Sequence, residues 1–127
     1  MTPNKIFFVG VHFKKGMDAL DSSTKSGKLI DAVIKYAPKN EYVKTNLFNT
    51  DYLPQKDNRE KYVLDWASKN NYNNKKDIIF ALGAIVQNEM INHFDIICVK
   101  HPASIWSNKS KQEYIDNIIS KLATLKK

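Results

Sequence analysis

The side chains in this sequence that are best suited to chemistry stand at or just after the ends of short apolar runs. An amide stands there at Asn46, imidazoles at His12 and His101, and aromatic rings nearby at Phe13 and Trp106. Aromatic rings can stack on a flat heterocycle, an amide can read the hydrogen-bonding edge of a base, and an imidazole can donate to a carbonyl oxygen or orient water. Together these residue types suit a pocket for a planar, hydrogen-bonding base.

The four apolar runs that would position these side chains are predicted to be strands. The first, residues 5–9, is apolar after its lysine and ends at Gly10, which is typical of a strand buried on both faces. The other predicted strands span residues 42–48, 77–82 and 95–100.

Each predicted strand is followed by residues with helical spacing of apolar side chains. The predicted helices cover residues 29–34, which lie between capping hydroxyls at 22–26 and Pro38, residues 62–66 ahead of an asparagine-rich stretch at 70–74, residues 84–91, and residues 114–122.

Strand and helix therefore alternate four times, which predicts an α/β fold: a three-layer α/β/α architecture with a four-stranded, mostly parallel central sheet. We expect a single domain over residues 1–127. In open sheets of this kind, ligands bind outside the carboxyl ends of the strands, near the switch in strand order. The segments expected to converge there are residues 10–16, 44–49, 82–84 and 100–106.

These four segments, with the helix start that follows the first of them, resemble the motifs of the uracil-DNA glycosylase superfamily, in the same order and with similar spacing. Members carry a glycine-rich motif after the first strand, as at Gly10, and a Ser-Gly or Ala-Gly helix start, as at Ser26-Gly27. A strand ending in asparagine resembles Thr45-Asn46, and a Leu-Gly turn resembles Leu82-Gly83. The final His-Pro-Ser motif resembles residues 101–104, and the resemblance spans nearly the whole chain. It implies a uracil-DNA glycosylase-like domain.

The resemblance also implies a function in base excision repair, as a DNA glycosylase that hydrolyses the N-glycosidic bond of a flipped uracil or related damaged base. Asn46 would hydrogen-bond the base, with Gly10 beside it. His101 would lie near a carbonyl oxygen of the base and stabilise charge on the leaving group. Phe13 would stack on the base or fill the core. The alternatives are a turn-forming amide at Asn46 and a loop histidine at His101.

The first motif departs from the family pattern. Members usually place Asp or Asn two residues after the glycine, or Glu one residue after it, followed by proline, and this group positions the attacking water. Here Val11 and His12 occupy those places, and Phe13 replaces the proline. His12 can orient or deprotonate water because imidazole titrates near neutrality. Asp18 or Asp21 could supply the missing carboxylate, or both could be solvated loop charges or helix N-terminal acids.

Contacts with DNA are expected around the same segments. By the resemblance, Ser104 would contact a phosphate, although the motif reads His-Pro-Ala-Ser and displaces this serine by one residue. Trp106 would wedge into the base stack or anchor its loop on the core. Lysines near the site could neutralise phosphates or belong to a solvated face. The predicted DNA-binding residues are Ser104, Trp106, Lys14, Lys15 and Ser26, with further lysines at 25, 28, 100, 109 and 111.

The composition agrees with this interpretation. The 127-residue chain is 43% hydrophobic and 26% charged, as in ordinary globular proteins, and its net charge of +7 favours a polyanion such as nucleic acid. A single cysteine, Cys98, excludes an intrachain disulfide and four-cysteine metal ligation. The apolar run at residues 6–9 is too short for a signal peptide, and no run approaches a membrane span. We expect a cytoplasmic monomer that binds single- or double-stranded, uracil-containing DNA, does not engage membranes, and needs no cofactor or metal.

Two other functions remain open from the sequence. The altered first motif is compatible with a module that binds DNA, a nucleobase or a nucleotide without chemistry. A parallel sheet is also compatible with a flavodoxin-like or other nucleotide-binding domain, but neither a GxGxxG motif nor a P-loop is present.

Overall fold

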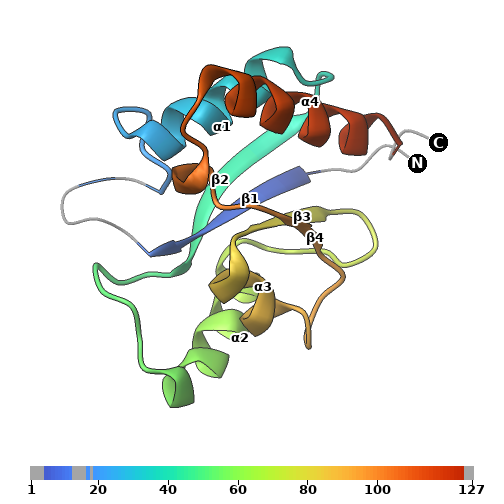
Figure 1. Cartoon of the computed structure of the whole chain (residues 1–127). Coiled ribbons are helices and arrows are strands. Elements are labelled where there is room, and N and C mark those ends of the chain that lie inside the picture. The colour runs from blue at the N-terminus through green and yellow to red at the C-terminus, as the bar shows by residue number, and fades with distance from the viewer. Residues whose placement is uncertain (1–4, 13–16, 18, 125–127) are drawn as a thin grey trace.

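The computed structural model describes residues 5–12, 17 and 19–124, with His12 described for its backbone only. Strands and helices alternate along the chain (Figure 1). The strands are β1 (Lys5–His12), β2 (Glu41–Phe48), β3 (Ile78–Leu82) and β4 (Ile97–Val99). The helices are α1 (Lys25–Tyr36), α2 (Arg59–Lys69), α3 (Ala84–Met90) and α4 (Asn108–Thr124), with short 3₁₀ turns η1 (Lys56–Asn58) and η2 (Pro102–Ser104).

The strands form one sheet in the order β2-β1-β3-β4, and every pair in it is parallel. Helices α1 and α4 cover one face, and α2 and α3 cover the other (Figure 1). The predicted three-layer α/β/α fold is confirmed, with a sheet that is parallel throughout. The order switches between β1 and β3, because the chain passes from β1 to β2 on one side and then returns to β3 on the other.

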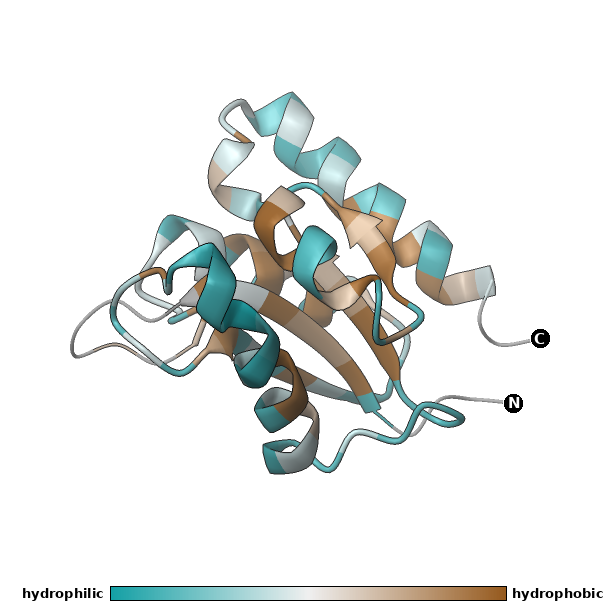
Figure 2. Ribbon diagram, turned by 90° about the horizontal axis from the view of Figure 1, so that it is seen from below, coloured by the Kyte–Doolittle hydropathy of each residue, from teal (hydrophilic) through white to brown (hydrophobic). Residues whose placement is uncertain are grey.

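The core lies on both faces of the sheet. Ile6 and Phe8 of β1 pack into the cluster beneath α1 and α4, whereas Phe7 and Val9 pack into the cluster beneath α2 and α3. Alternate residues of a strand point to opposite faces, so an uninterrupted apolar run is what a strand buried on both faces requires. Figure 2 shows these apolar strands enclosed between helices with hydrophilic outer faces.

β2 and β3 each begin within one residue of the predicted start, whereas β1 and β4 differ more from the prediction. β1 continues past Gly10 because its pairing with β2 extends to His12 opposite Phe48. β4 covers only residues 97–99 of the expected 95–100, because it is an edge strand that pairs with β3 at three positions. Its middle residue, Cys98, is exposed.

None of the helices in the described part of the chain combines the length and apolar character needed to cross a membrane.

Candidate functional site

A cavity of about 300 Å³ lies where the ends of β1 and β2 meet the loops before α1 and after β4. This volume is at the lower end of the range for small-molecule sites, about 300–1,000 Å³. Asn46 and His101 both line it, although they are far apart in the sequence. The remaining polar side chains in the described lining are Asp21, Thr24 and Ser26, and the larger apolar ones are Val11, Met17, Leu20, Leu53 and Ile85.

Gly10 makes room for the amide of Asn46. The two residues are opposite each other in the pairing of β1 with β2. A Cβ atom at residue 10 would lie 2.7 Å from Oδ1 of Asn46 and 3.3 Å from Cδ2 of Leu20. Asn46 is half-buried, and no hydrogen bond joins its side chain to another residue within the described ranges. The amide is therefore available to a ligand in the cavity.

His101 presents a neutral imidazole. Its Nδ1 accepts a hydrogen bond of 3.1 Å from the backbone N–H of Ala103. In a neutral ring this bond assigns the proton to Nε2, so the second nitrogen is a donor. Burial lowers the pKa of His101, because it penalises the charged form. The side chain therefore acts as an uncharged hydrogen-bond donor at neutral pH.

Gly83 allows His101 to pack against the end of β3. Gly83 has a φ of 91°, in the region that favours glycine, and a Cβ atom there would lie 3.0 Å from Cβ of His101. Its N–H donates to the carbonyl of Val99 at 3.0 Å, which joins the ends of β3 and β4. The Leu-Gly turn therefore has a packing role directly beside the candidate imidazole.

Two side chains fix the segment that precedes His101. The amide of Gln87 donates to the carbonyls of Ala81 and Val99, at 3.2 and 2.9 Å, and so bridges the carboxyl ends of β3 and β4. The hydroxyl of Tyr114 donates to the carbonyl of Lys100 at 2.6 Å. Burial raises the pKa of the Tyr114 phenol, which keeps it protonated as a donor.

Asp21 brings a carboxylate to the cavity. It follows Leu20, whose φ of 48° lies in the left-handed region that few non-glycine residues adopt, and whose buried side chain packs beside Gly10. Oδ1 of Asp21 accepts from the N–H and hydroxyl of Ser23, at 2.8 and 2.7 Å. A Cβ atom at Gly27 would lie 1.8 Å from the carbonyl oxygen of Asp21, so the first turn of α1 can approach this loop only with glycine at that position.

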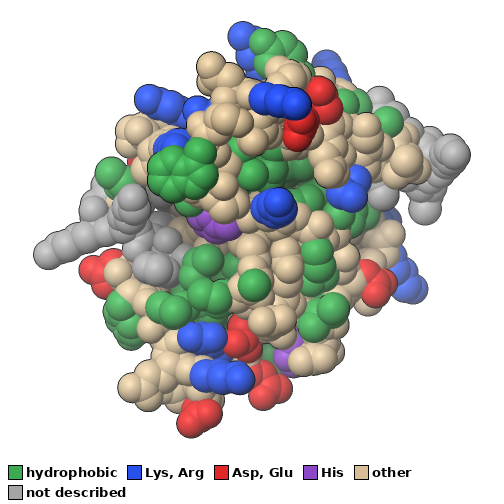
Figure 3. Space-filling view, in the orientation of Figure 1, with side chains coloured by type: hydrophobic (Ala, Val, Ile, Leu, Met, Phe, Trp, Pro, Cys, Tyr) green, Lys and Arg blue, Asp and Glu red, His purple; other side chains and the backbone are tan. Residues whose placement is uncertain are grey.

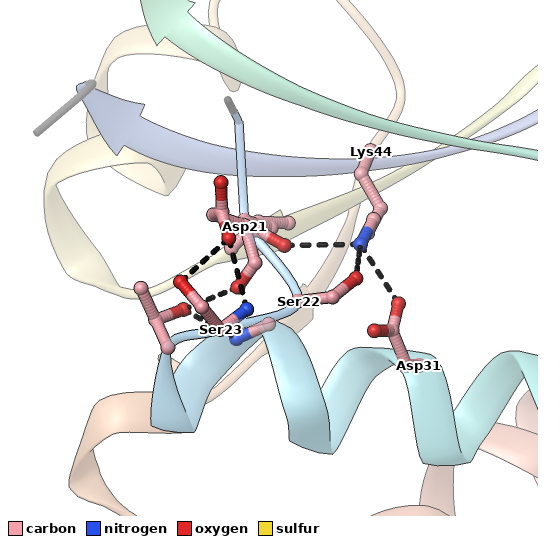
Figure 4. Close-up of polar contacts among 8 residues, drawn as sticks. Asp21, Ser22, Ser23, Asp31 and Lys44 are labelled. Carbon is pink, nitrogen blue, oxygen red and sulfur yellow. Dashed lines mark hydrogen bonds and ion pairs between the residues drawn. The ribbon is translucent and has the colours of Figure 1, made fainter. Parts of the chain in front are cut away.

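Lys44 holds the same loop from β2 (Figure 4). Its Nζ donates to the carbonyl of Leu20 at 3.0 Å, the hydroxyl of Ser22 at 3.1 Å and Oδ1 of Asp31 at 2.7 Å. Burial alone would raise the pKa of Asp31, but hydrogen bonds from Lys44 and Ser22, together with the charge of Lys44, lower it overall. Lys44 therefore contacts the residues on both sides of Asp21 and ties them to α1.

The other predicted residues within the described ranges fall in different places. Ser26 lines the cavity itself. The hydroxyl of Ser104 donates to the carbonyl of His101 at 2.7 Å, and Ser104 lines a second cavity beside α4 instead. Trp106 is 74% exposed, and the neighbouring Ile105 is the side chain buried in the core. The alternative that Trp106 anchors its loop on the core is therefore wrong.

The remaining predicted site residues lie outside the described residues. These are the side chain of His12, and Phe13, Lys14, Lys15 and Asp18. The prediction did not include Met17, Leu53 and Ile85, which supply apolar walls of the cavity. Two of these come from irregular segments, and no periodicity in the sequence marks them.

The described lining fits an uncharged, flat ligand. It contains one carboxylate and no lysine or arginine, so it offers no cation to a phosphate group. An amide, an uncharged imidazole donor and apolar walls suit a heterocycle with carbonyl and N–H groups on its edge. Over the described ranges, no group of three or more His, Cys, Asp or Glu side chains is placed to hold a metal ion.

Comparison with known proteins gives no family for this chain: no family model matches it, and no curated protein matches it.

Proposed function

We propose that the protein is a monofunctional DNA glycosylase that hydrolyses the N-glycosidic bond of a flipped uracil, or a related damaged base, in DNA. The observation that carries this proposal is that Asn46 and His101 line one cavity at the carboxyl ends of the strands. The motif resemblance supplies the reaction class. The cavity supports it by offering an amide, an imidazole and a carboxylate around a space suited to one base.

Asn46 selects the base in this proposal. An amide presents an acceptor beside donors, which complements an edge where a carbonyl adjoins an N–H, as in uracil. His101 donates from Nε2 to a carbonyl oxygen of the base. As the N-glycosidic bond breaks, its electron pair moves to the base, and negative charge develops on that oxygen. A donor already placed there stabilises this charge, and loss of one such donor typically costs about 10²–10³ in rate.

Asp21 serves as the group that activates water, in place of the acid or amide that the first motif lacks. The water oxygen bonds to the anomeric carbon of the sugar as the base leaves with the electron pair. The water proton passes to the carboxylate and from there to the released base. General base assistance of this kind typically contributes about 10²–10⁴ in rate.

The test is incubation of the pure protein with uracil-containing single- and double-stranded oligonucleotides, followed by alkaline cleavage at abasic sites. We expect abasic product, and a loss of at least about 10² in rate for Asn46→Ala, His101→Gln and Asp21→Asn. Asn49→Ala is the matched control, because Asn49 is an exposed amide one residue beyond β2 that does not line the cavity. Absence of product from both substrates, beside an active control enzyme, would refute the proposal.

A second candidate is a module that binds a nucleobase or DNA without chemistry. The sequence Val11-His12 in the first motif favours it, and so does the engagement of the Asp21 carboxylate by Ser23. This function predicts calorimetric binding of uracil that is lost in Asn46→Ala, with no abasic product from any uracil-containing strand.

A further inference from the structure

Trp106 is an exposed aromatic side chain with a lysine over its ring. The indole is 74% exposed, and Nζ of Lys25 lies 3.7 Å from the ring centroid. Lys25 stands between Thr24 and Ser26, both of which line the cavity. The ring therefore contacts a residue of the first turn of α1, a segment that contributes to the wall of the cavity, and most of its surface is exposed.

The covered face decides how this ring can meet a nucleic acid. A side chain that wedges into a duplex inserts between two neighbouring bases and needs both faces of its ring. With one face under an ammonium group, Trp106 can stack on one base only. Stacking on a single base is the mode by which exposed aromatic rings bind single strands. It also keeps the cation–π contact with Lys25 intact.

Lysines, whose charge is complementary to a phosphate backbone, occupy the first turns of α1 and α4. The first turns of α1 and α4 contain Lys25, Lys28, Lys109 and Lys111 and no acidic residue. A lysine at the start of a helix interacts unfavourably with the helix dipole, so these side chains do not stabilise α1 and α4 through it. η2 packs against α1, and Trp106 lies in the sequence between η2 and α4. Figure 3 shows several lysine side chains, with a few acidic ones among them, on the surface of the layer that α1 and α4 form.

We propose that Trp106 and Lys25 form a one-sided stacking platform for a nucleotide next to the base in the cavity, and that the substrate is therefore single-stranded DNA. The placement of the neighbouring base in the cavity rests on the proposed glycosylase function. The preference for a single strand does not require cleavage, so it can be measured separately.

The experiment measures binding of uracil-free DNA by tryptophan fluorescence. The probes are a thymidine oligonucleotide of about 12 nucleotides, within the range of single-strand site sizes, and its duplex with the complementary strand. Trp66 is buried and donates to the hydroxyl of Thr45, so quenching by DNA reports on the exposed Trp106. We expect tighter binding of the single strand.

Variants identify the platform. Trp106→Ala should weaken single-strand binding about 5- to 140-fold, which corresponds to about 1–3 kcal/mol per stacked base, and change duplex binding less than about threefold; for variants lacking Trp106, a fluorescent label on the DNA replaces the tryptophan signal. Trp106→Phe should retain most of the affinity. Tyr36→Ala is the matched control, since Tyr36 is 64% exposed at the far end of α1 with Nζ of Lys35 5.5 Å from its ring centroid.

Equal or tighter binding of the duplex would overturn the platform, and so would an equal loss for both probes in Trp106→Ala. If Trp106→Ala weakens single-strand binding as expected but the wild-type protein excises no uracil, the platform is supported and the glycosylase function is refuted. If the protein excises uracil but Trp106→Ala binds single strands as the wild type does, the glycosylase function is supported and the platform is refuted.

Discussion

Replacing Lys44 by methionine should loosen the loop that carries Asp21 while leaving the core intact. Methionine keeps the apolar stem but removes the ammonium, and with it the hydrogen bonds to Leu20, Ser22 and Asp31. The carbonyl of Leu20 then loses the donor that holds its left-handed backbone in place.

The size of the effect follows from how exposed these groups are. The side chains of Lys44 and Asp31 are 22% and 39% exposed. A fully exposed ion pair contributes about 0.2–1 kcal/mol, whereas removing one partner of a buried pair costs about 3–5 kcal/mol. Asp31 can rehydrate when Lys44 is removed, but three bonds are lost together. We therefore expect the free energy of unfolding to fall by about 2 kcal/mol.

Urea unfolding at neutral pH measures this loss, with Lys69→Met as the matched control. Lys69 forms one ion pair, to Asp65 four residues earlier on α2, and both side chains are about half exposed, at 57% and 48%. Its loss should cost no more than about 0.5 kcal/mol.

The same comparison has a predicted dependence on pH. The pKa of Asp31 is lower in the folded protein than its usual value of about 3.9. A carboxyl with a depressed folded pKa stabilises the fold above its unfolded pKa and loses that contribution as the pH falls through the folded pKa. The difference between wild type and Lys44→Met should be complete at pH 7 and shrink below about pH 4. Equal losses for Lys44→Met and Lys69→Met, or a difference unchanged at pH 3, would refute this account of the loop.

Three further results are expected from the cavity. Because burial lowers the pKa of His101, the unfolded chain takes up this proton first as the pH falls, so the free energy of unfolding should drop below about pH 6.5; urea unfolding between pH 5 and 8 should show a flatter profile for His101→Gln. Gly10→Ala places a Cβ atom 2.7 Å from Oδ1 of Asn46, and the amide can move away from it. The loss of uracil-binding free energy, measured by calorimetry, should therefore exceed the loss of the free energy of unfolding, measured in urea. Gly83→Ala forces alanine to a φ of 91° and a contact of 3.0 Å with His101, and should lower the free energy of unfolding in urea by at least about 1–2 kcal/mol.

The fold was largely predictable because its signals are local. The apolar run of β1 is uninterrupted since successive residues are buried on opposite faces of the sheet. Alternation of strand and helix then leaves few topologies other than a parallel sheet. The extent of β4 was not predictable, because an edge strand is limited by its pairing with β3 and not by its own apolar character.

The site was predictable only in part. The rule that ligands bind at the carboxyl ends of strands selected Asn46 and His101 from the sequence. The sequence could not rank Asp21 against Asp18, since both stand in one loop, and the structure describes only Asp21, at the cavity. The hydrogen bonds of Lys44 were missed because its partners lie 13–24 residues away and no spacing relates them.

The most direct test of the account is a crystal structure of the protein grown with saturating uracil. We expect the base in the cavity, with its edge within hydrogen-bonding distance of the Asn46 amide and a carbonyl oxygen within that distance of Nε2 of His101, and an empty cavity in Asn46→Ala. Uracil bound elsewhere, for example in the cavity beside α4 that Ser104 lines, or bound in the same place in Asn46→Ala, would contradict it.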